Sequence, residues 1–394
     1  MRSRRLGSLA VICAACAIVL TGCATSPHRT VAPSGGPVHL PSFSSIHMVN
    51  SVTGWGVGWG VAPALSLWFT NNGARTWKRI SLPGVPRNPV SLTVDPTSSH
   101  TAWVAVSSVA TVSNHGGPVL LFRTTNAGRR WSAMPKPPGG AGLPLAGSLD
   151  FLNARDGWLI LQAPHGMGSS PGVLYRTSDG GTSWQPISRT PITNVPSDAP
   201  PATTLPVAGQ LTFTSSQDGW LVGSQVSTGA RSLYETTDGG VAWRLVHLPT
   251  FPSGALSDSV LGAPRTDGAL LTVPVSYQDS TGNTGVVLLR STDGGKTWSA
   301  GAPLSRAVDV SALSGLSALA LRLGAYDLLH PSQYTRQATL WRTDDGGASW
   351  RPVAKLSTAL KRQLGGVQLF MAFVNSGSGF IWAAPANAVA GRVI

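Results

Sequence analysis

Residues 177–184 read TSDGGTSW, and five further copies of this eight-residue motif lie elsewhere along the chain. Three copies, at 236–243, 291–298 and 343–350, keep the Asp-Gly-Gly sequence and the closing tryptophan. The copies at 70–77 and 124–131 have asparagine in place of the aspartate. Between 52 and 59 residues separate one closing tryptophan from the next. A nearly regular period of this size indicates repeated supersecondary units that pack side by side.

The composition of the motif suits a tight hairpin between two strands. Glycine reaches the positive φ angles that such turns need, and the side-chain oxygen of aspartate or asparagine accepts hydrogen bonds from the turn's own backbone. The closing tryptophan returns over the hairpin and buries a large apolar area. We therefore interpret the motif as structural. Its defining residues are Asn72 and Trp77, Asn126 and Trp131, Asp179 and Trp184, Asp238 and Trp243, Asp293 and Trp298, and Asp345 and Trp350.

A second recurring phrase, an apolar residue followed by a polar turn and Gly-Trp, lies at 48–55, 151–158 and 213–220. Short, strongly apolar strands follow it. Each repeat then holds four antiparallel strands, which make one propeller blade. First strands begin near residues 48, 92, 151, 213, 260, 309 and 370. We predict an all-β, seven-bladed β-propeller of four-stranded antiparallel blades, with 38–43 as the outer strand of the seventh; six blades, the number of turn motifs, is the alternative.

The alternation of Gly-Trp strands with Thr-x-Asp-Gly-Gly-x-x-Trp turns resembles the Asp-box, or bacterial neuraminidase repeat, families. It is most similar to the photosystem II stability and assembly factor type of propeller, and sialidases and sortilin-type receptors share the Asp box more distantly. The resemblance covers residues 42–394. It implies a β-propeller whose boxes lie away from the functional centre, and a partner that is a membrane protein or its assembly intermediate.

The N-terminus has the layout of a secretory signal. Arg2, Arg4 and Arg5 precede an apolar stretch at 6–20 that is too short to span a membrane, and LTGC follows at 20–23. These four residues resemble the lipobox of bacterial lipoproteins, which implies cleavage before Cys23 and lipidation of its thiol; an ordinary signal with a chance cysteine is the alternative. We expect a signal peptide at 1–22, a lipidated cysteine and flexible linker at 23–41, and the propeller at 42–394, anchored on the extracytoplasmic face of a bacterial cell membrane.

Composition limits the chemistry of the folded part. The three cysteines, Cys13, Cys16 and Cys23, all lie at the N-terminus, so we expect no disulfide, no cysteine-bound metal and no cofactor in the propeller. Without the three arginines of the signal the net charge is +10, which suits lipid headgroups, an acidic glycan or an acidic protein face. A basic surface that only keeps the protein soluble is the alternative. The basic residues form no runs, so we expect no nucleic-acid partner, and we expect a monomer.

Loop length favours one face of the ring as the binding surface. The turns that carry the motif are short, whereas the connections at 136–147, 163–172, 187–209, 277–285 and 324–337 are long and irregular. Long loops without secondary structure are commonly functional; drift in loop length without function is the alternative. The densest polar and aromatic cluster on this face, a composition typical of interaction sites, is Tyr326, Asp327, His330, Tyr334 and Arg336.

Four arginines recur three residues before the aspartate position of their motifs: Arg123, Arg176, Arg290 and Arg342. A ring of arginines could bind carboxylates or phosphates. Alternatively, each arginine pairs with its own turn or covers apolar surface with its aliphatic stem.

The residues give little support to a sialidase activity. The resemblance to sialidases implies an arginine triad and a tyrosine activated by glutamate, but this chain has one glutamate, Glu235, in a strand directly before a turn motif. An inverting pair of aspartates, drawn from Asp150, Asp309 and Asp327 among others, stays open. We therefore predict a non-enzymatic, lipid-anchored scaffold that binds or helps to assemble a membrane or envelope protein. The alternative is a glycan-binding or glycan-hydrolysing, sialidase-like surface protein.

Overall fold

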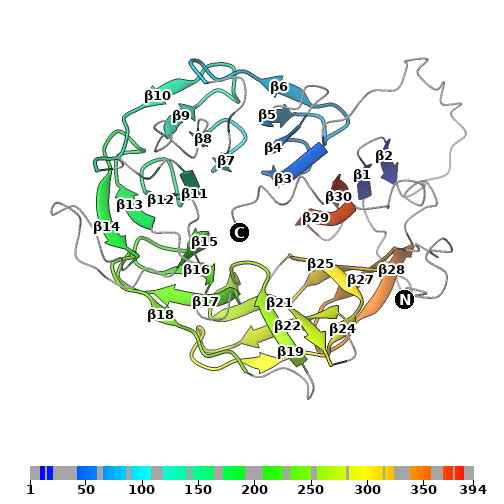
Figure 1. Ribbon diagram of the computed structural model, residues 1–394. Coiled ribbons are helices and arrows are strands. Elements are labelled where there is room, and N and C mark those ends of the chain that lie inside the picture. Colours follow the sequence, from blue (N-terminus) through cyan, green and yellow to red (C-terminus); the bar gives the residue numbers. More distant parts are fainter. Residues whose placement is uncertain are drawn as a thin grey trace, which may run out of the picture.

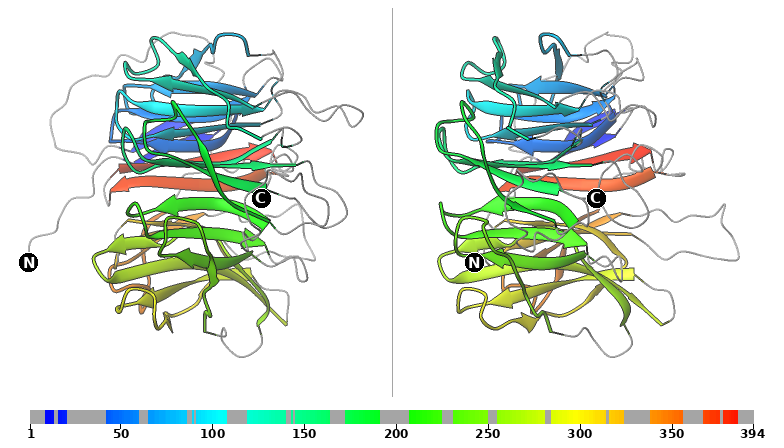
Figure 2. Two further views of the ribbon diagram at one scale, coloured as in Figure 1. Left: turned by 90° about the vertical axis from the view of Figure 1, so that its left-hand side faces the viewer. Right: turned by 60° about the vertical axis from the view of Figure 1, so that its left-hand side comes forward.

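The computed structural model shows strands arranged in sheets around a central axis (Figure 1). Seen edge-on, the ring is a thick disc, and the strands cross its thickness (Figure 2). Residues are described at 9–13, 16–20, 42–59, 65–85, 89, 91–107, 119–139, 143, 145–163, 172–190, 207–224, 231–249, 255–280, 284–313, 316–323, 338–355, 367–375 and 378–385. The secondary structure of these ranges consists of strands and turns, which confirms the predicted all-β propeller.

Blades 1 to 4 each consist of four consecutive antiparallel strands, ordered from the centre to the rim (Figure 1). Their strands are β3 (Ser42–Met48), β4 (Gly54–Trp59), β5 (Leu65–Thr70) and β6 (Lys78–Ile80); β7 (Ser91–Pro96), β8 (Ala102–Ser107), β9 (Leu120–Thr124) and β10 (Ser132–Met134); β11 (Leu145–Phe151), β12 (Gly157–Gln162), β13 (Gly172–Thr177) and β14 (Gln185–Arg189); and β15 (Val207–Phe213), β16 (Gly219–Ser224), β17 (Arg231–Thr236) and β18 (Arg244–Leu245).

Blades 5 and 6 are also antiparallel, and in blade 5 two short strands, β20 and β24, lie off the four-stranded path. Blade 5 contains β19 (Ala255–Val260), β20 (Arg265–Asp267), β21 (Leu270–Asp279), β22 (Thr284–Ser291), β23 (Ser299–Ala300) and β24 (Leu304–Ser305). Blade 6 contains β25 (Ala307–Ala312), β26 (Ala318–Arg322), β27 (Thr339–Thr343) and β28 (Arg351–Lys355). Six antiparallel blades therefore follow the predicted pattern.

The seventh sheet departs from that pattern. It is ordered β2-β1-β30-β29, with β29 at Val367–Asn375, β30 at Ser378–Pro385, β1 at Leu9–Cys13 and β2 at Cys16–Leu20. The hairpin of β29 and β30 is antiparallel, but β1 pairs in parallel with β30. The prediction of a seventh four-stranded antiparallel blade is thus wrong for its outer half, which comes from the expected export signal.

The prediction that 38–43 supplies this outer strand is also wrong. Residues 38–41 lie outside the described ranges, and Ser42 and Phe43 begin β3, the inner strand of blade 1. The reason is packing: the buried ring of Phe43 contacts Trp77, the closing tryptophan of the same blade, with 4.5 Å between the ring centroids. Phe370 and Ala372 of β29 pack on the same cluster, so Phe43 joins blade 1 to the seventh sheet.

The hydrophobic core lies between neighbouring blades. One cluster joins Trp103 and Leu121 of blade 2 to Leu149, Phe151 and Leu159 of blade 3, and a second cluster joins blade 3 to blade 4 in the same way. Strands β8 and β12 are buried at every residue, because a sheet face of one blade is covered by the next on each side. Continuous apolar runs such as 158–161 are the sequence signature of such strands.

Polar side chains connect the inner strands of successive blades. The carboxylate of Asp95 accepts a hydrogen bond from the backbone N–H of Phe151, and Asp150 accepts one from Phe213 at 2.7 Å. Asp309 in blade 6 accepts one from Met371 of β29 at 2.6 Å. An innermost strand has one edge without a strand neighbour, and these acceptors satisfy N–H groups on that edge.

Burial raises the pKa of Asp95 to about 8, and the charge of Asp150 adds to this effect. Burial also raises the pKa of Asp150 to about 6. In the Asp-box turns the opposite holds. The hydrogen bonds from Ser183 lower the pKa of Asp179 to about 2, and those from Ser349 and Thr343 lower the pKa of Asp345 to about 2.

These shifts predict that thermal stability is highest near pH 4. Asp95 and Asp150 bind protons more tightly in the folded state, so their contribution is full below the unfolded pKa near 4 and is lost as the pH rises towards 8. The box aspartates contribute above that unfolded pKa and lose their contribution as the pH falls towards 2. Calorimetry of the isolated propeller from pH 2 to 9 measures this profile.

Two isosteric variants separate the limbs of the profile. Asp95→Asn keeps an acceptor for the Phe151 N–H and should reduce the loss of thermal stability between pH 4 and 8. Asp179→Asn should reduce the loss of thermal stability below pH 4. A melting temperature that rises steadily from pH 4 to 8 would contradict the assignment of Asp95.

Candidate functional site

Each Asp-box turn is closed by its own side chains. In the 177–184 box, Thr177 Oγ1 donates to Asp179 Oδ1 at 2.8 Å and accepts from the N–H of Gly181 at 2.9 Å. Asp179 in turn accepts from the N–H of Ser183 at 2.8 Å, while Gly180 and Gly181 have φ angles of 75° and 90°. Asp238, Asp293 and Asp345 make equivalent bonds. The box carboxylates therefore serve the turn.

The two diverged boxes keep this geometry with different residues. Asn72 Oδ1 accepts from the N–H of Thr76 at 3.1 Å, and Asn126 Oδ1 accepts from the N–H of Arg130 at 2.9 Å. Ala74 and Ala127 occupy glycine positions at φ angles of 60° and 57°. Such angles are unfavourable for alanine, so the hairpin bonds and the packing of the blade hold these turns in place.

Tryptophans near the start of second strands, Trp103 after Ala102 and Trp158 after Gly157, bind one blade to the box of the next. Trp103 of β8 stacks on Phe151 of blade 3 with 3.9 Å between centroids, and its indole N–H donates to the Gly180 carbonyl at 2.9 Å. Trp158 of β12 stacks on Phe213 of blade 4 at 3.6 Å and donates to the Gly239 carbonyl at 2.9 Å. The carbonyl that accepts each of these bonds belongs to an Asp-box turn.

The recurring arginines lie at these same junctions. The guanidinium of Arg123 lies 5.0 Å from the centre of the Trp103 ring, and that of Arg176 lies 5.3 Å from the centre of the Trp158 ring. Arg123 also donates to the carbonyl of Ala154 in blade 3 at 3.4 Å. Arg342 pairs with Asp344 of its own box at 2.6 Å. These contacts favour the local interpretation of the arginines over an open anion-binding ring.

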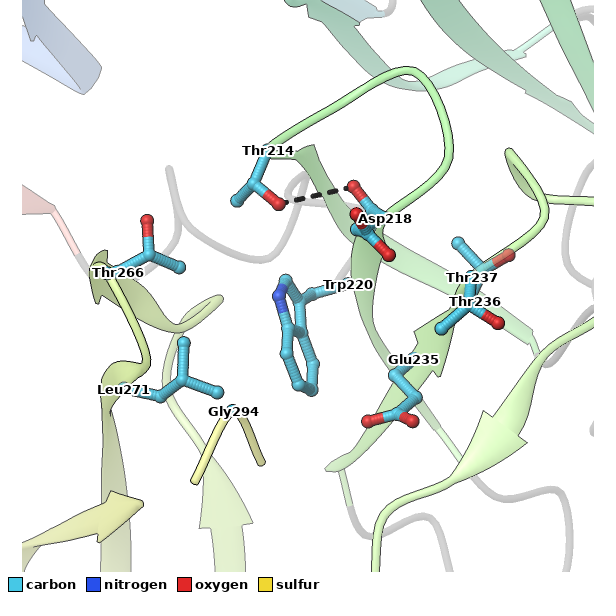
Figure 3. Close-up of a pocket in the computed structure, with 11 residues that line it drawn as sticks. Thr214, Asp218, Trp220, Glu235, Thr236, Thr237, Thr266, Leu271 and Gly294 are labelled. Atoms are coloured by element: carbon cyan, nitrogen blue, oxygen red, sulfur yellow. Dashed lines mark hydrogen bonds between the residues drawn. The ribbon is translucent and has the colours of Figure 1, made fainter. Parts of the chain in front are cut away.

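The junction between blades 4 and 5 is built differently and contains a cavity of about 330 Å³ (Figure 3). Its aromatic wall is Trp220 of β16, and Glu235 of β17 stands beside it (Figure 3). Blade 4 supplies hydroxyl groups and a further carboxylate, and blade 5 supplies the opposite wall. The lining residues are Thr214, Asp218, Gly219, Trp220, Glu235, Thr236, Thr237, Thr266, Gly268, Leu271 and Gly294.

The charges of this pocket are held by nearby partners. Glu235 Oε1 accepts from Arg244 Nη2 at 2.5 Å; the side chain of Glu235 is 16% exposed and that of Arg244 is 61% exposed. Asp218 Oδ2 accepts from Ser215 Oγ at 2.8 Å, and the Asp218 carbonyl accepts from Thr214 at 3.3 Å (Figure 3). The lining thus has two carboxylates, and the one guanidinium bonded to them lies outside it.

Trp220 makes fewer contacts across its junction than Trp103 and Trp158 do. The residue is 7% exposed, and its ring makes an edge contact with Trp298, at 6.4 Å between centroids. Within the part of the chain that the structure describes, no hydrogen bond is found for its indole N–H and no phenylalanine stacks on it. Trp55, at the junction of blades 1 and 2, likewise makes an edge contact with a closing tryptophan, Trp131, and its indole N–H has no hydrogen-bond partner. Among the described residues, the stacked and hydrogen-bonded contact is therefore made by Trp103 and Trp158, and Trp220 lacks it.

The sites expected from the sequence have different outcomes. Cys23 and the cluster of Tyr326, Asp327, His330, Tyr334 and Arg336 lie outside the described residues. The pocket opens among the short turns and involves none of the long connections, so loop length did not indicate it. One signal in the sequence marks it: the single glutamate of the chain stands at the position that four other repeats fill with arginine.

Asp150 and Asp309, two of the aspartates considered for hydrolysis, do not form a pair with each other. Asp150 and Asp309 each accept a backbone N–H of the following sheet, at opposite parts of the ring, and Asp327 is outside the described ranges. No group of three or more histidine, cysteine or acidic side chains suited to a metal ion occurs in the described ranges. Nor does any helix in those ranges have the length and apolar character needed to cross a membrane.

Comparison with known proteins agrees with the hairpin geometry. Residues 158–365 match the family model of the BNR repeat-like domain, which covers more than half of the chain. The chain belongs to the BNR repeat-like domain family. No curated protein matches its sequence.

Solved structures similar to this BNR repeat-like propeller include binding proteins and polysaccharide-degrading enzymes. "YCF48 bound to D1 peptide" has a TM-score of 0.52 and 17% identity and covers 88% of this chain and 90% of that one. A PL25 ulvan lyase has a TM-score of 0.50 and 12% identity, with 85% and 88% covered. A GH74 xyloglucanase from Xanthomonas campestris has a TM-score of 0.48 and 15% identity, with 88% and 55% covered. At these identities the likeness to the first two structures shows the fold alone.

The two kinds of junction predict different costs for removing their tryptophans. Trp158→Ala should lower the free energy of unfolding by about 3–5 kcal/mol, because it leaves a large void in a closed junction. Trp220→Ala should cost about 1–2 kcal/mol less, since this ring has neither the stacked phenylalanine nor the indole hydrogen bond. Urea unfolding of the two variants measures the difference, and equal losses would contradict the described asymmetry.

Proposed function

We propose that the protein is a lipid-anchored, extracytoplasmic propeller that holds a protein partner at the membrane surface as a binding or assembly scaffold. The observation that carries this proposal is the pocket between blades 4 and 5. It lies at a junction that lacks the stacked phenylalanine and the indole hydrogen bond of the two preceding junctions, and it combines an aromatic ring with carboxylates. A concave site with a few convergent polar groups is the usual form of a binding site.

The surroundings of the carboxylates support binding better than hydrolysis. A glycosidase needs one carboxyl group free to donate a proton and a second free to act as base or nucleophile. Here Glu235 is bonded to Arg244 and Asp218 to Ser215, and the box aspartates are acceptors within their turns. These bonds keep the side chains in place as fixed negative charges.

A protein partner is also consistent with the relatives and with the seventh sheet. One structure of the same fold is that of YCF48 bound to a D1 peptide. In this chain β30 pairs with β1, which lies within the expected signal. Cleavage before Cys23 would remove that strand and leave the β30 edge open to a strand from a partner.

Crosslinking in intact membranes tests the scaffold function. The full-length protein is expressed in its native host, crosslinked in the membrane and purified, and mass spectrometry identifies the attached proteins. We expect one membrane or envelope protein to be enriched over a control with an unrelated lipoprotein. A panel of fluorogenic glycosides provides the opposing measurement: hydrolysis that is lost in Asp218→Asn or Glu235→Gln would contradict the scaffold and favour a glycan-processing enzyme.

Lipidation is tested by substitution of Cys23. Cys23→Ser removes the thiol that would carry the lipid, so the protein should lose incorporation of labelled palmitate and leave the lipid-modified membrane fraction. Cys16→Ser is the matched control and should keep the label, because residue 16 lies within the segment that cleavage removes. Palmitate labelling that persists in Cys23→Ser would contradict the anchor.

A further inference from the structure

Glu235 occupies the position of the repeat arginine. In blades 2 and 3 the residue paired across the strands with the second-strand tryptophan is arginine, in the pairs Trp103–Arg123 and Trp158–Arg176. In blade 4 the equivalent pair is Trp220–Glu235. A guanidinium lies over the ring in the first two blades, and a carboxylate stands beside it in the third.

The space that the arginine would fill is open. Arg123 Nη1 lies 2.9 Å from the point where a Cβ on Gly180 would stand, and Arg176 Nη1 lies 2.8 Å from that point on Gly239. Arg290 fills the same place at Gly346 with its side-chain stem, at 2.8 Å. At Gly294, the first glycine of the blade 5 box, nothing lies within 4 Å of that point.

Blade 5 keeps the rest of the guanidinium site. In blade 3 the N–H of Gly180 donates to Arg155, and the carbonyl of the preceding residue, Ala154, accepts from Arg123. In blade 5 the N–H of Gly294 donates to Ala269, so Gly268 stands where Ala154 stands in blade 3. Gly268 lines the pocket, as does the Trp220 ring, so both the acceptor position and the aromatic face are present.

We propose that this pocket binds the guanidinium of an arginine side chain supplied by a partner protein. The ligand would lie over the Trp220 ring, face Glu235 and Asp218, and donate to the Gly268 carbonyl, in the way that the chain's own arginines do at other junctions. A planar cation can stack on the Trp220 ring and donate several hydrogen bonds to the carboxylates and the carbonyl. The guanidinium of arginine does both, and it is better suited to this than the ammonium group of lysine. This inference rests on the proposed function, which supplies a protein partner.

Arg244 does not fill the site. It binds Glu235 Oε1 from β18, and its side chain is 61% exposed. The other oxygen, Oε2, lies 3.7 Å from the Cβ point of Gly295, on the blade 5 side of the junction. One carboxylate oxygen thus remains directed towards blade 5 while Arg244 holds the other, and a second guanidinium can approach without displacing the first.

The test uses short blocked peptides and the full mature propeller. Acetyl-Gly-Arg-Gly-amide is titrated while the indole N–H signal of Trp220, assigned with Trp220→Phe, is followed by NMR. We expect saturable binding, with at least about tenfold weaker binding of the citrulline peptide, which keeps the shape and loses the charge. Glu235→Gln should weaken binding of the arginine peptide by a similar factor.

Glu235→Arg is the decisive variant, because it introduces the arginine that four other repeats have at this position. Its own guanidinium should fill the pocket, so binding of the arginine peptide should be lost while the melting temperature stays equal or rises. Asp218→Asn should also weaken binding of the arginine peptide. Asp156→Asn is its matched control, because Asp156 occupies the equivalent turn of blade 3, and its replacement should leave binding unchanged. Arginine-peptide binding that is as tight in Glu235→Arg as in the natural chain would overturn the proposal.

The outcomes for the pocket and for the scaffold are distinguishable. If crosslinking recovers a partner equally from the natural chain and from Glu235→Arg, and the arginine peptide does not bind, the pocket proposal fails and the scaffold stands. If the peptide binds as expected and no partner is recovered, the scaffold fails. A Trp220 signal that shifts with methyl glycosides and not with the arginine peptide would overturn the guanidinium assignment in favour of a sugar.

Discussion

The structure depends on the contact between the second strand of one blade and the Asp-box hairpin of the next. A four-stranded sheet has two apolar faces and cannot bury them alone, so each blade is stable only against its neighbours. Trp103 and Trp158 make this contact through a stacked phenylalanine and a hydrogen bond to a box glycine. The box and the Gly-Trp phrase, which look like separate motifs in the sequence, are therefore two halves of one interaction.

The same contact decides where the ring can bind something else. Where the tryptophan, the phenylalanine and the arginine are all present, they fill the junction and leave no room for a ligand. Between blades 4 and 5 the arginine is replaced by Glu235 and no phenylalanine covers Trp220, and a pocket results. The candidate site thus lies where the residues of the contact differ from those of blades 2 and 3. Its acidic character follows from the replacement of the arginine by Glu235.

Several aspartates of this fold are hydrogen-bond acceptors for the backbone and so have a structural role. Asp95, Asp150 and Asp309 satisfy backbone N–H groups of the next inner strand, and the box aspartates satisfy those of their own turns. The buried group is less acidic and the turn group more acidic than a free carboxyl, for the opposite reasons of desolvation and hydrogen bonding. Aspartates that could have formed a hydrolytic pair are instead part of the framework.

The sequence by itself determined the hairpins, the blade strands and the family, because the donors, acceptors and glycines of each turn lie within eight consecutive residues. It also contained the substitution at Glu235, but not its meaning, since Arg123 and Arg176 act on glycines of a following blade. The acceptor role of Asp150, the placement of Phe43 in β3 and the strand beside β30 were likewise decided by tertiary structure alone. Each depends on which surface the closed ring brings opposite a given strand, and local pattern carries no information about that neighbour.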